Sequence, residues 1–318
     1  MYGGPVNNIG VTGANGFVAK ALVNALSQRI GIGVTAITRQ ETDVVMRRVR
    51  KCVVPGGVPD PEFFLDLDGV VHTAARVHVM HETSGDPLQE FRKVNVDATL
   101  AIARNAAAAG VRRFVFISSA KVNGEVTFPG KPFTETDKPS LLDAYAISKW
   151  EAELGLAEIS RQTSMEVVII RPPLVYGPGV KANFASLMKA VRHGIPLPLK
   201  AVHNSRSLIG LENLVDFISV CISHSKAANQ TFLVSDGFDV STSVLVRTMA
   251  QAIGLPDRQF SVPVPLLKLA GRLTGKAAMI ERLCGNLQVD ITKAQTLLGW
   301  APPVSFEDGI RNAMLGKS

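Results

Sequence analysis

The chain has 318 residues, of which 46% are hydrophobic and 19% charged, and its formal net charge is +7. This length and composition allow a large buried core and argue against disorder. The three cysteines, Cys52, Cys221 and Cys284, lack the spacing of a disulfide framework or a zinc site, so we expect no metal.

The charge and the apolar segments restrict the possible partners and location. A basic excess suits anionic small molecules, but the Lys and Arg residues are dispersed along the chain, so we expect no nucleic-acid partner. No N-terminal stretch has the pattern of a secretion signal, and no apolar run reaches membrane-spanning length. The sequence therefore favours a cytoplasmic protein without membrane insertion.

Short apolar runs alternate with longer amphipathic stretches as far as residue 176, which is typical of βαβ units. Strands are predicted at residues 9–12, 34–38, 70–73, 113–118 and 167–171. Helices are predicted at residues 17–27 and 91–109, the second ending before Gly110. The fold class expected is α/β, a Rossmann-type doubly wound parallel sheet.

Turn-forming prolines and glycines become frequent after residue 171, which suggests that a second unit begins there. We expect residues 1–176 to form a dinucleotide-binding domain, to which residues 204–236 return with a helix at 211–222 and a strand at 231–234. Residues 177–203 and 237–318 are then a smaller, partly interleaved substrate-binding lobe.

A glycine-containing turn, residues 12–17, lies between the first predicted strand and helix. Gly13 allows a tight turn and Gly16 lets the backbone approach a pyrophosphate, which the helix N-terminus attracts. The pattern indicates that Gly13, Asn15, Gly16 and Phe17 bind a dinucleotide. A β-to-α turn without a ligand is the alternative.

The end of the second predicted strand bears on the choice of cofactor. It reads Thr38-Arg39 and has no carboxylate to bind the adenosine ribose, whereas a guanidinium can bind a 2′-phosphate. Thr38 and Arg39 therefore favour NADP(H), with NAD(H) possible. Alternatively, Arg39 is an exposed loop residue.

Two further motifs point to proton transfer. Tyr145 and Lys149 are one helical turn apart, and a nearby ammonium is expected to lower the pKa of a phenol. Lys149 can also reach a nicotinamide ribose. Ser119 follows a strand at the edge of the sheet where ligands collect, and can donate to a substrate oxygen. Ser118 is the alternative hydroxyl, and either serine could be a turn residue.

Through these motifs the chain resembles an extended short-chain dehydrogenase/reductase of the nucleotide-sugar epimerase/dehydratase type, over nearly its whole length. Further matching segments lie at residues 71–75, 94–99, 171–178, 290–294 and 298–300. The resemblance implies a catalytic tetrad and cofactor contacts from Ala74 and Pro172. The tetrad is Asn95, Ser119, Tyr145 and Lys149. It also implies a UDP- or dTDP-sugar substrate, and a homodimer formed through a helical bundle.

The same resemblance assigns substrate binding to Asn183, Arg206 and Arg282, where arginines would bind a diphosphate. A turn asparagine and surface arginines are the alternatives. Ala120-Lys121 replaces the Asp-Glu pair of the family's dehydratases, which argues against a 4,6-dehydratase. Asn123 replaces the tyrosine of the family's Val-Tyr-Gly, a change that we expect to alter the pocket wall.

Within this family, Arg39 favours a 4-ketoreductase that acts on a UDP-4-keto-6-deoxy-N-acetylhexosamine in bacterial surface-polysaccharide (lipopolysaccharide) synthesis. A UDP-glucose or UDP-N-acetylglucosamine 4-epimerase with retained NAD is the alternative. A non-catalytic nucleotide-sensing protein is a remote third.

Overall fold

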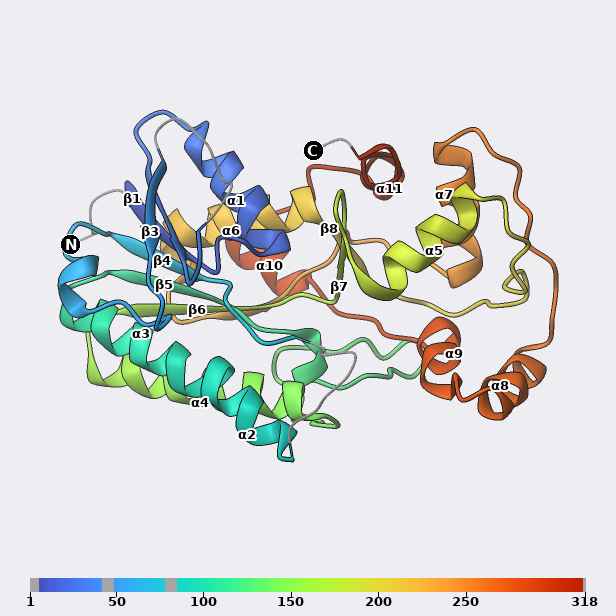
Figure 1. Cartoon of the computed structure of the whole chain (residues 1–318), viewed down its shortest axis with the longest axis horizontal. Coiled ribbons are helices and arrows are strands. Elements are labelled where there is room, and N and C mark those ends of the chain that lie inside the picture. Colours follow the sequence, from blue (N-terminus) through green and yellow to red (C-terminus); the bar gives the residue numbers. More distant parts are fainter. Residues whose placement is uncertain (1–5, 42–48, 78–84, 317–318) are drawn as a thin grey trace.

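The computed structural model of the protein describes residues 6–41, 49–77 and 85–316. Seven strands form one parallel sheet in the order β3-β2-β1-β4-β5-β6-β9 (Figure 1). Their bounds are β1 Asn8–Thr12, β2 Gly33–Thr38, β3 Val49–Val53, β4 Gly69–His72, β5 Arg113–Ile117, β6 Glu166–Arg171 and β9 Thr231–Leu233. This order confirms the Rossmann-type prediction, and it reverses between β1 and β4, where such sheets bind their ligands.

The six predicted strands, including the returning one, lie within one residue of the observed bounds, but β3 was not predicted. It is an edge strand whose Arg50 and Lys51 are exposed. Charged residues are common on edge strands because they discourage pairing with other chains. They also remove the alternation of apolar and polar residues by which a strand is recognised.

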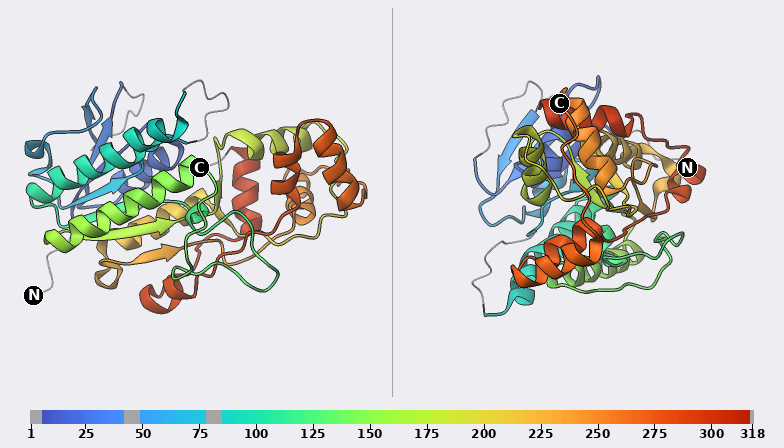
Figure 2. Two further views of the ribbon diagram at one scale, coloured as in Figure 1. Left: turned by 90° about the horizontal axis from the view of Figure 1, so that it is seen from below. Right: turned by 90° about the vertical axis from the view of Figure 1, so that its right-hand side faces the viewer.

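Helices cover both faces of the sheet. One core joins the sheet to α1 (Phe17–Ser27), α6 (Leu211–Ser223) and α10 (Thr292–Leu298). The other joins it to α3 (Ala98–Ala108) and α4 (Ala144–Gln162). Figure 2 shows α3 and α4 running side by side along the outside of the sheet.

The helix predicted at residues 91–109 consists of three parts. These are α2 (Pro87–Arg92), a π-helical turn (Lys93–Asp97) and α3. Short π-helical turns occur often at functional sites. The wider turn here contains Asn95, which is fully buried.

A second lobe packs around its own apolar core at the other end of the molecule (Figures 1 and 2). It contains the short parallel pair β7 (Leu174–Tyr176) and β8 (Leu208–Gly210). Its helices are α5 (Ala182–Arg192), α7 (Thr242–Ala252), α8 (Val264–Leu273), α9 (Ala277–Cys284) and α11 (Phe306–Leu315). Among the described residues, 3₁₀ turns lie at Pro61–Phe64, Ala120–Val122 and Ser225–Ala227.

Side chains as well as strand pairing hold the returning segment with α6 and β9 against the sheet. Arg113 on β5 donates to the carbonyl oxygens of Cys221 and His224, at 2.7 and 3.1 Å, beyond the middle of α6. Glu135 accepts a hydrogen bond from the Leu233 N–H at 2.9 Å. Trp300 packs in the same core as β1, although it lies in the segment predicted for the substrate lobe. Within the described residues, no helix is both long and apolar enough to cross a bilayer.

Candidate active site

The turn between β1 and α1 has a geometry that requires glycine. Gly13 has φ +68°, and a Cβ there would lie 2.8 Å from Ala74 Cα and 2.9 Å from Ala74 N. A Cβ on Gly16 would meet only the Gly13 carbonyl oxygen, at 3.0 Å, so the outer side of the turn is open. No side chain caps α1, and its first N–H groups are available to an anion. These residues fit a dinucleotide pyrophosphate.

The other predicted cofactor residues beside this turn differ in exposure and in the hydrogen bonds that they already form within the chain. Asn15 is exposed, and its amide donates to the Glu41 carbonyl oxygen at 3.4 Å. Thr38 is buried, and its hydroxyl donates to the Gln40 carbonyl oxygen at 2.6 Å. Arg39 is exposed, and its methylene groups lie against Gly57. Of the pair Thr38-Arg39, the guanidinium is therefore the group that a nucleotide can reach.

A buried histidine whose role the sequence did not indicate contacts the end of β1, directly before the glycine turn. His72, the last residue of β4, is hydrogen-bonded to the hydroxyls of Thr12 at 2.8 Å and Thr99 at 3.0 Å. Its ring stacks near Phe114 and Phe116. Burial, and secondarily the charge of Lys149, lowers the pKa of His72 to about 3. The ring is thus a neutral link between β1, β4 and α3.

Ser119 and Tyr145 come together at the end of β5. Ser119 precedes a 3₁₀ turn, where its Oγ accepts from the Lys121 N–H at 3.2 Å, and its side chain lies close enough to the Tyr145 phenol to lower the pKa of that group. Asp143 caps α4 by accepting from the Ala146 N–H at 2.7 Å, which fixes where the helix begins. The Tyr145 side chain is half-buried and edge-on to Phe91, so it is not enclosed in the packed interior.

Lys149 lies one turn further along α4 and is buried. Its Nζ donates to the Ile117 carbonyl oxygen at 2.7 Å and lies 4.4 Å from the centre of the Phe116 ring. Burial lowers the pKa of Lys149 to about 7, against an opposing effect of Glu153. A group with this pKa can exchange a proton near neutral pH.

The expected lowering of the phenol pKa is wrong for the chain as described. Burial raises the pKa of Tyr145 to about 12, Asp143 raises it further, and only the hydrogen bond with Ser119 opposes them. The reason is geometric, because the Lys149 ammonium is directed at Ile117 and Phe116. Tyr145 is consequently a protonated phenol at neutral pH and can donate a proton to a carbonyl oxygen.

Asn95 fixes the position of two segments beside Tyr145 by hydrogen bonds. Its side-chain oxygen accepts from the Arg76 N–H at 2.7 Å, and its amide donates to the Arg76 carbonyl oxygen at 3.0 Å and to Ser148 Oγ at 2.9 Å. Ser148 in turn donates to the Tyr145 carbonyl oxygen at 2.8 Å. These contacts link the segment after β4 to the first turn of α4.

Ser118 belongs to a different, buried network. Its hydroxyl donates to Glu153 at 2.5 Å, and Glu153 forms an ion pair with Arg171 at 2.5 Å. Asn123 accepts from Arg171 at 3.1 Å and donates to the Thr134 carbonyl oxygen at 2.8 Å. Asn123 is only 1% exposed, so its side chain supports this network; that its replacement of a tyrosine alters the pocket wall stays a prediction.

Pro172 connects the ends of two strands beside this network. Its carbonyl oxygen accepts from the Ala120 N–H at 2.9 Å, which ties the end of β6 to the turn after β5. The contact holds Ser119 next to a proline predicted to border the cofactor. It thus helps to set the position of the Ser119 backbone.

Two of the three predicted substrate residues are neighbours. Arg206 donates to the carbonyl oxygens of Arg282 at 2.9 Å and Gly285 at 3.1 Å. Burial lowers the pKa of Arg206, and the positive charge of Arg282 lowers it further. An anion bound between the two guanidiniums would relieve this repulsion. Asn183 is exposed near the start of α5, separate from the contacts of this pair.

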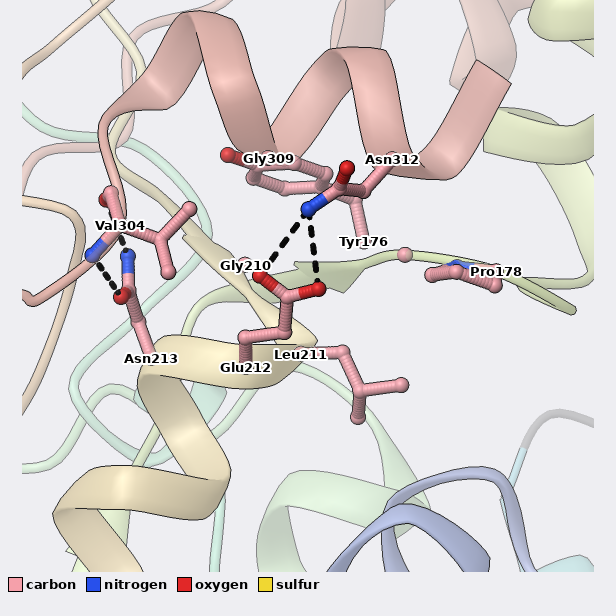
Figure 3. A pocket seen from close by; sticks show the side chains of 10 residues that line it. Tyr176, Pro178, Gly210, Leu211, Glu212, Asn213, Val304, Gly309 and Asn312 are labelled. Atoms are coloured by element: carbon pink, nitrogen blue, oxygen red, sulfur yellow. Dashed lines mark hydrogen bonds between the residues drawn. The ribbon is translucent and has the colours of Figure 1, made fainter. Parts of the chain in front are cut away.

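A small pocket between α6 and α11 is a separate feature (Figure 3). Asn312 bridges it by donating to both oxygens of Glu212, at 3.0 and 3.2 Å, and Asn213 pairs with the Val304 backbone. Tyr176 also lines the pocket, but no predicted site residue does. The pocket therefore marks the packing of two helices and lies apart from the proposed chemistry.

A parallel sheet with a phosphate-binding turn, a hydroxyl pair and a buried lysine defines a nicotinamide-dependent enzyme. The profile of the NAD dependent epimerase/dehydratase family matches residues 9–235. The chain belongs to this family, which confirms the resemblance to extended short-chain dehydrogenases/reductases.

Comparison with individual proteins extends this result. The chain is 46% identical over 309 residues to a UDP-glucose 4-epimerase of Vibrio cholerae, covering 95% of this chain and 92% of the relative. It is 27% identical to an N-acetyl-alpha-D-glucosaminyl-diphospho-ditrans,octacis-undecaprenol 4-epimerase of Escherichia coli O157:H7, covering 77% of this chain and 76% of the relative. The crystal structure of UDP-glucuronic acid 4-epimerase from Bacillus cereus with NAD is similar in fold, with a TM-score of 0.78, 18% identity, and 98% and 96% of the two chains covered.

Proposed function

We propose that the protein is an NAD-dependent 4-epimerase of a UDP-linked hexose. The observation that carries the proposal is the placement of the Ser119 and Tyr145 side chains next to each other at the carboxyl end of β5, with buried Lys149 one helical turn further along α4. Such a group serves the reversible oxidation of an alcohol, and the likeness to the Vibrio cholerae 4-epimerase over 95% of this chain supports sugar carbon 4 as the reacting position. The 4-epimerase thus takes precedence over the 4-ketoreductase that Arg39 favours in the sequence.

Each residue has a distinct part in the proposed reaction. Oxidation at carbon 4 needs Tyr145 as a phenolate that accepts the proton of the sugar hydroxyl, a state that the positive charge of an oxidised nicotinamide would favour. In the return step the phenol gives this proton back to the ketone oxygen, and Ser119 hydrogen-bonds the same oxygen. Lys149 is buried beside this group, and its ammonium could pass a proton to the ribose of a bound nicotinamide. A bound nicotinamide supplies the exchange of hydride. Asn95 is a positioning residue, because its side chain is occupied with Arg76 and Ser148.

The substrate diphosphate is assigned to Arg206 and Arg282. Their adjacency and the lowered pKa of Arg206 indicate a locus of concentrated positive charge, which suits a diphosphate better than a neutral sugar. Asn183, exposed at the start of α5, is assigned to the same substrate from the side of the second lobe.

A 4-ketoreductase that uses NADPH is the second candidate, and Arg39 is the observation that favours it. The side chain is exposed at the end of β2, where a 2′-phosphate would lie, and the neighbouring Thr38 hydroxyl is bonded within the chain. For Arg39→Asp we expect a shift in affinity from NADPH toward NADH, measured by titration of both cofactors. Unchanged selectivity would show that Arg39 does not discriminate between them.

One pair of incubations separates the two candidates. Purified protein is mixed with UDP-N-acetylglucosamine or UDP-glucose without added cofactor, and separately with a UDP-4-keto-6-deoxy-N-acetylhexosamine and NADPH. Appearance of the carbon-4 epimer in the first mixture supports the epimerase. Stoichiometric loss of nicotinamide absorbance in the second supports the reductase. Inertness in both would favour a non-catalytic nucleotide sensor.

We also propose a cytoplasmic homodimer that acts in surface-polysaccharide synthesis. The dimer would form through α3 and α4, since α4 leaves Leu154 52% exposed on the outside of the sheet. Sedimentation velocity of the wild type and of Leu154→Glu tests it. A mass unchanged by the substitution would show that this face is not the interface.

A further inference from the structure

The helical hairpin formed by α8 and α9 has an outward apolar surface that the proposed reaction does not use. On α8, Leu266 is 55% exposed, Leu269 53% and Leu273 80%. Met279 on α9 is also exposed, at 38%. A soluble protein rarely places several large apolar side chains together on one exposed helix, and such surfaces mark contact with a partner.

The hairpin does not need this surface for its own folding. The opposite side of α8 carries buried Leu267 and Gly271, and a Cβ on Gly271 would lie 2.8 Å from Ile280 on α9. Leu267 packs with the core of the second lobe. Residues 266, 269 and 273 follow the i, i+3, i+7 spacing and form a separate stripe on the solvent side.

Basic residues border the apolar stripe. Lys268 and Arg272 are one turn apart on α8, beside Leu269, and Lys276 lies in the short connection to α9, and all three are exposed. The one acidic residue between positions 264 and 284 is Glu281. An apolar stripe bordered by Lys and Arg is typical of helices that lie in the interface of an anionic membrane, where the long basic side chains reach the lipid phosphates.

The same charges argue against a second copy of this chain as the occupant. A two-fold interface brings the same patch of both subunits together. Each copy would present Lys268, Arg272 and Lys276 to the other, with Glu281 as the one acidic residue of the hairpin. Figures 1 and 2 show α8 at the end of the molecule opposite the parallel sheet.

We propose that the outer face of the α8–α9 hairpin docks the protein onto an anionic lipid bilayer. Leu266, Leu269 and Leu273 enter the boundary between headgroups and acyl chains, and Lys268 and Arg272 pair with lipid phosphates. The helix lies along the surface and does not cross the bilayer. This docking is independent of the reaction that the active site performs.

Co-sedimentation with vesicles tests the proposal on the full-length protein. Vesicles of phosphatidylglycerol and phosphatidylethanolamine are compared with vesicles of phosphatidylcholine alone, at low and high salt. We expect binding to the anionic vesicles that weakens with salt, and little binding to the neutral ones. Absence of binding to the anionic vesicles overturns the proposal.

Variants assign the binding to the hairpin. Leu269→Ser with Leu273→Ser should lower the partition coefficient at least about tenfold, because two exposed leucines no longer enter the lipid. Lys268→Gln with Arg272→Gln should remove most of the salt dependence without altering the apolar stripe. The control is Ile30→Ser, which removes an exposed apolar side chain at the opposite end of the chain and should bind as the wild type does.

Folding of each variant is checked by circular dichroism and by NAD binding at the distant turn, so that a misfolded variant is not scored. Vesicle binding by the leucine variant then tests the proposal. If the leucine variant misfolds, the salt dependence of binding by the charge variant tests it instead. Wild-type binding by the variant that folds overturns the proposal. So does a self-association that the leucine variant abolishes in the absence of vesicle binding, since that result identifies a second copy as the occupant.

Discussion

Substitution of Gly13 by alanine tests the nucleotide-binding turn most directly, and Gly31→Ala is its matched control. Both glycines have positive φ, +68° and +83°, so either substitution places an L-residue in a left-handed conformation at about 1–2 kcal/mol. The two positions differ in the space available for an added Cβ atom. A Cβ at Gly31 has nothing within 4 Å, whereas one at Gly13 would lie 2.8 Å from the Ala74 backbone.

The contact with Ala74 adds an overpacking penalty of about 1–3 kcal/mol at Gly13 alone. We therefore expect Gly13→Ala to lower the free energy of unfolding by about 2–5 kcal/mol and Gly31→Ala by about 1–2 kcal/mol, both measured by urea denaturation. Affinity for the dinucleotide, measured by calorimetry, should fall at least about tenfold for Gly13→Ala only, because the turn must move to accommodate the methyl group. Equal destabilisation of the two variants, with unchanged affinity, would refute the reasoning.

Two further predictions concern the proton chemistry and the core. Tyr145→Phe should lower turnover at least about a hundredfold and leave cofactor binding nearly intact. The control Tyr176→Phe loses a hydrogen bond to Asp236 and should affect stability more than turnover. Similar turnover of Tyr145→Phe and wild type would remove Tyr145 from the mechanism. His72 is neutral when folded because its pKa is about 3 against 6.5 when exposed, so the unfolded chain binds a proton first and stability falls as the pH drops from 6.5 toward 3. Relative to His72→Gln, the wild type should lose up to about 1.4 kcal/mol per pH unit in that window, and parallel pH profiles of the two proteins would contradict the assignment.

The parts of the site that could be predicted from the sequence depend on local geometry. Gly13 and Gly16 lie between a strand and a helix, and Tyr145 and Lys149 share a helix face, so spacing along the chain is enough to place each pair. The fold class follows for the same reason, since alternating strands and helices recur at short range.

The features that the sequence did not reveal, and the phenol pKa that it predicted wrongly, depend on contacts between distant segments. The π-helical turn at Asn95 is associated with hydrogen bonds to Arg76 and Ser148, 19 and 53 residues away. The raised pKa of Tyr145 reflects burial and the direction in which Lys149 points, neither of which is visible in the spacing of the two residues. Asn123 is directed inward by Arg171, 48 positions further along the chain.

The bonds that join the first 176 residues to the returning segment with α6 and β9 bear on how new substrate preferences can arise in this fold. A chimera that fused the first 176 residues to the remainder of a distant relative would put at risk the pairing of the edge strand β9, the hydrogen bonds of Arg113 to the end of α6, and the hydrogen bond between Glu135 and Leu233. We therefore expect wholesale exchange of halves to give insoluble protein. Altered sugar preference should instead arise by single replacements on the exposed loops of the second lobe, with the cofactor half inherited unchanged.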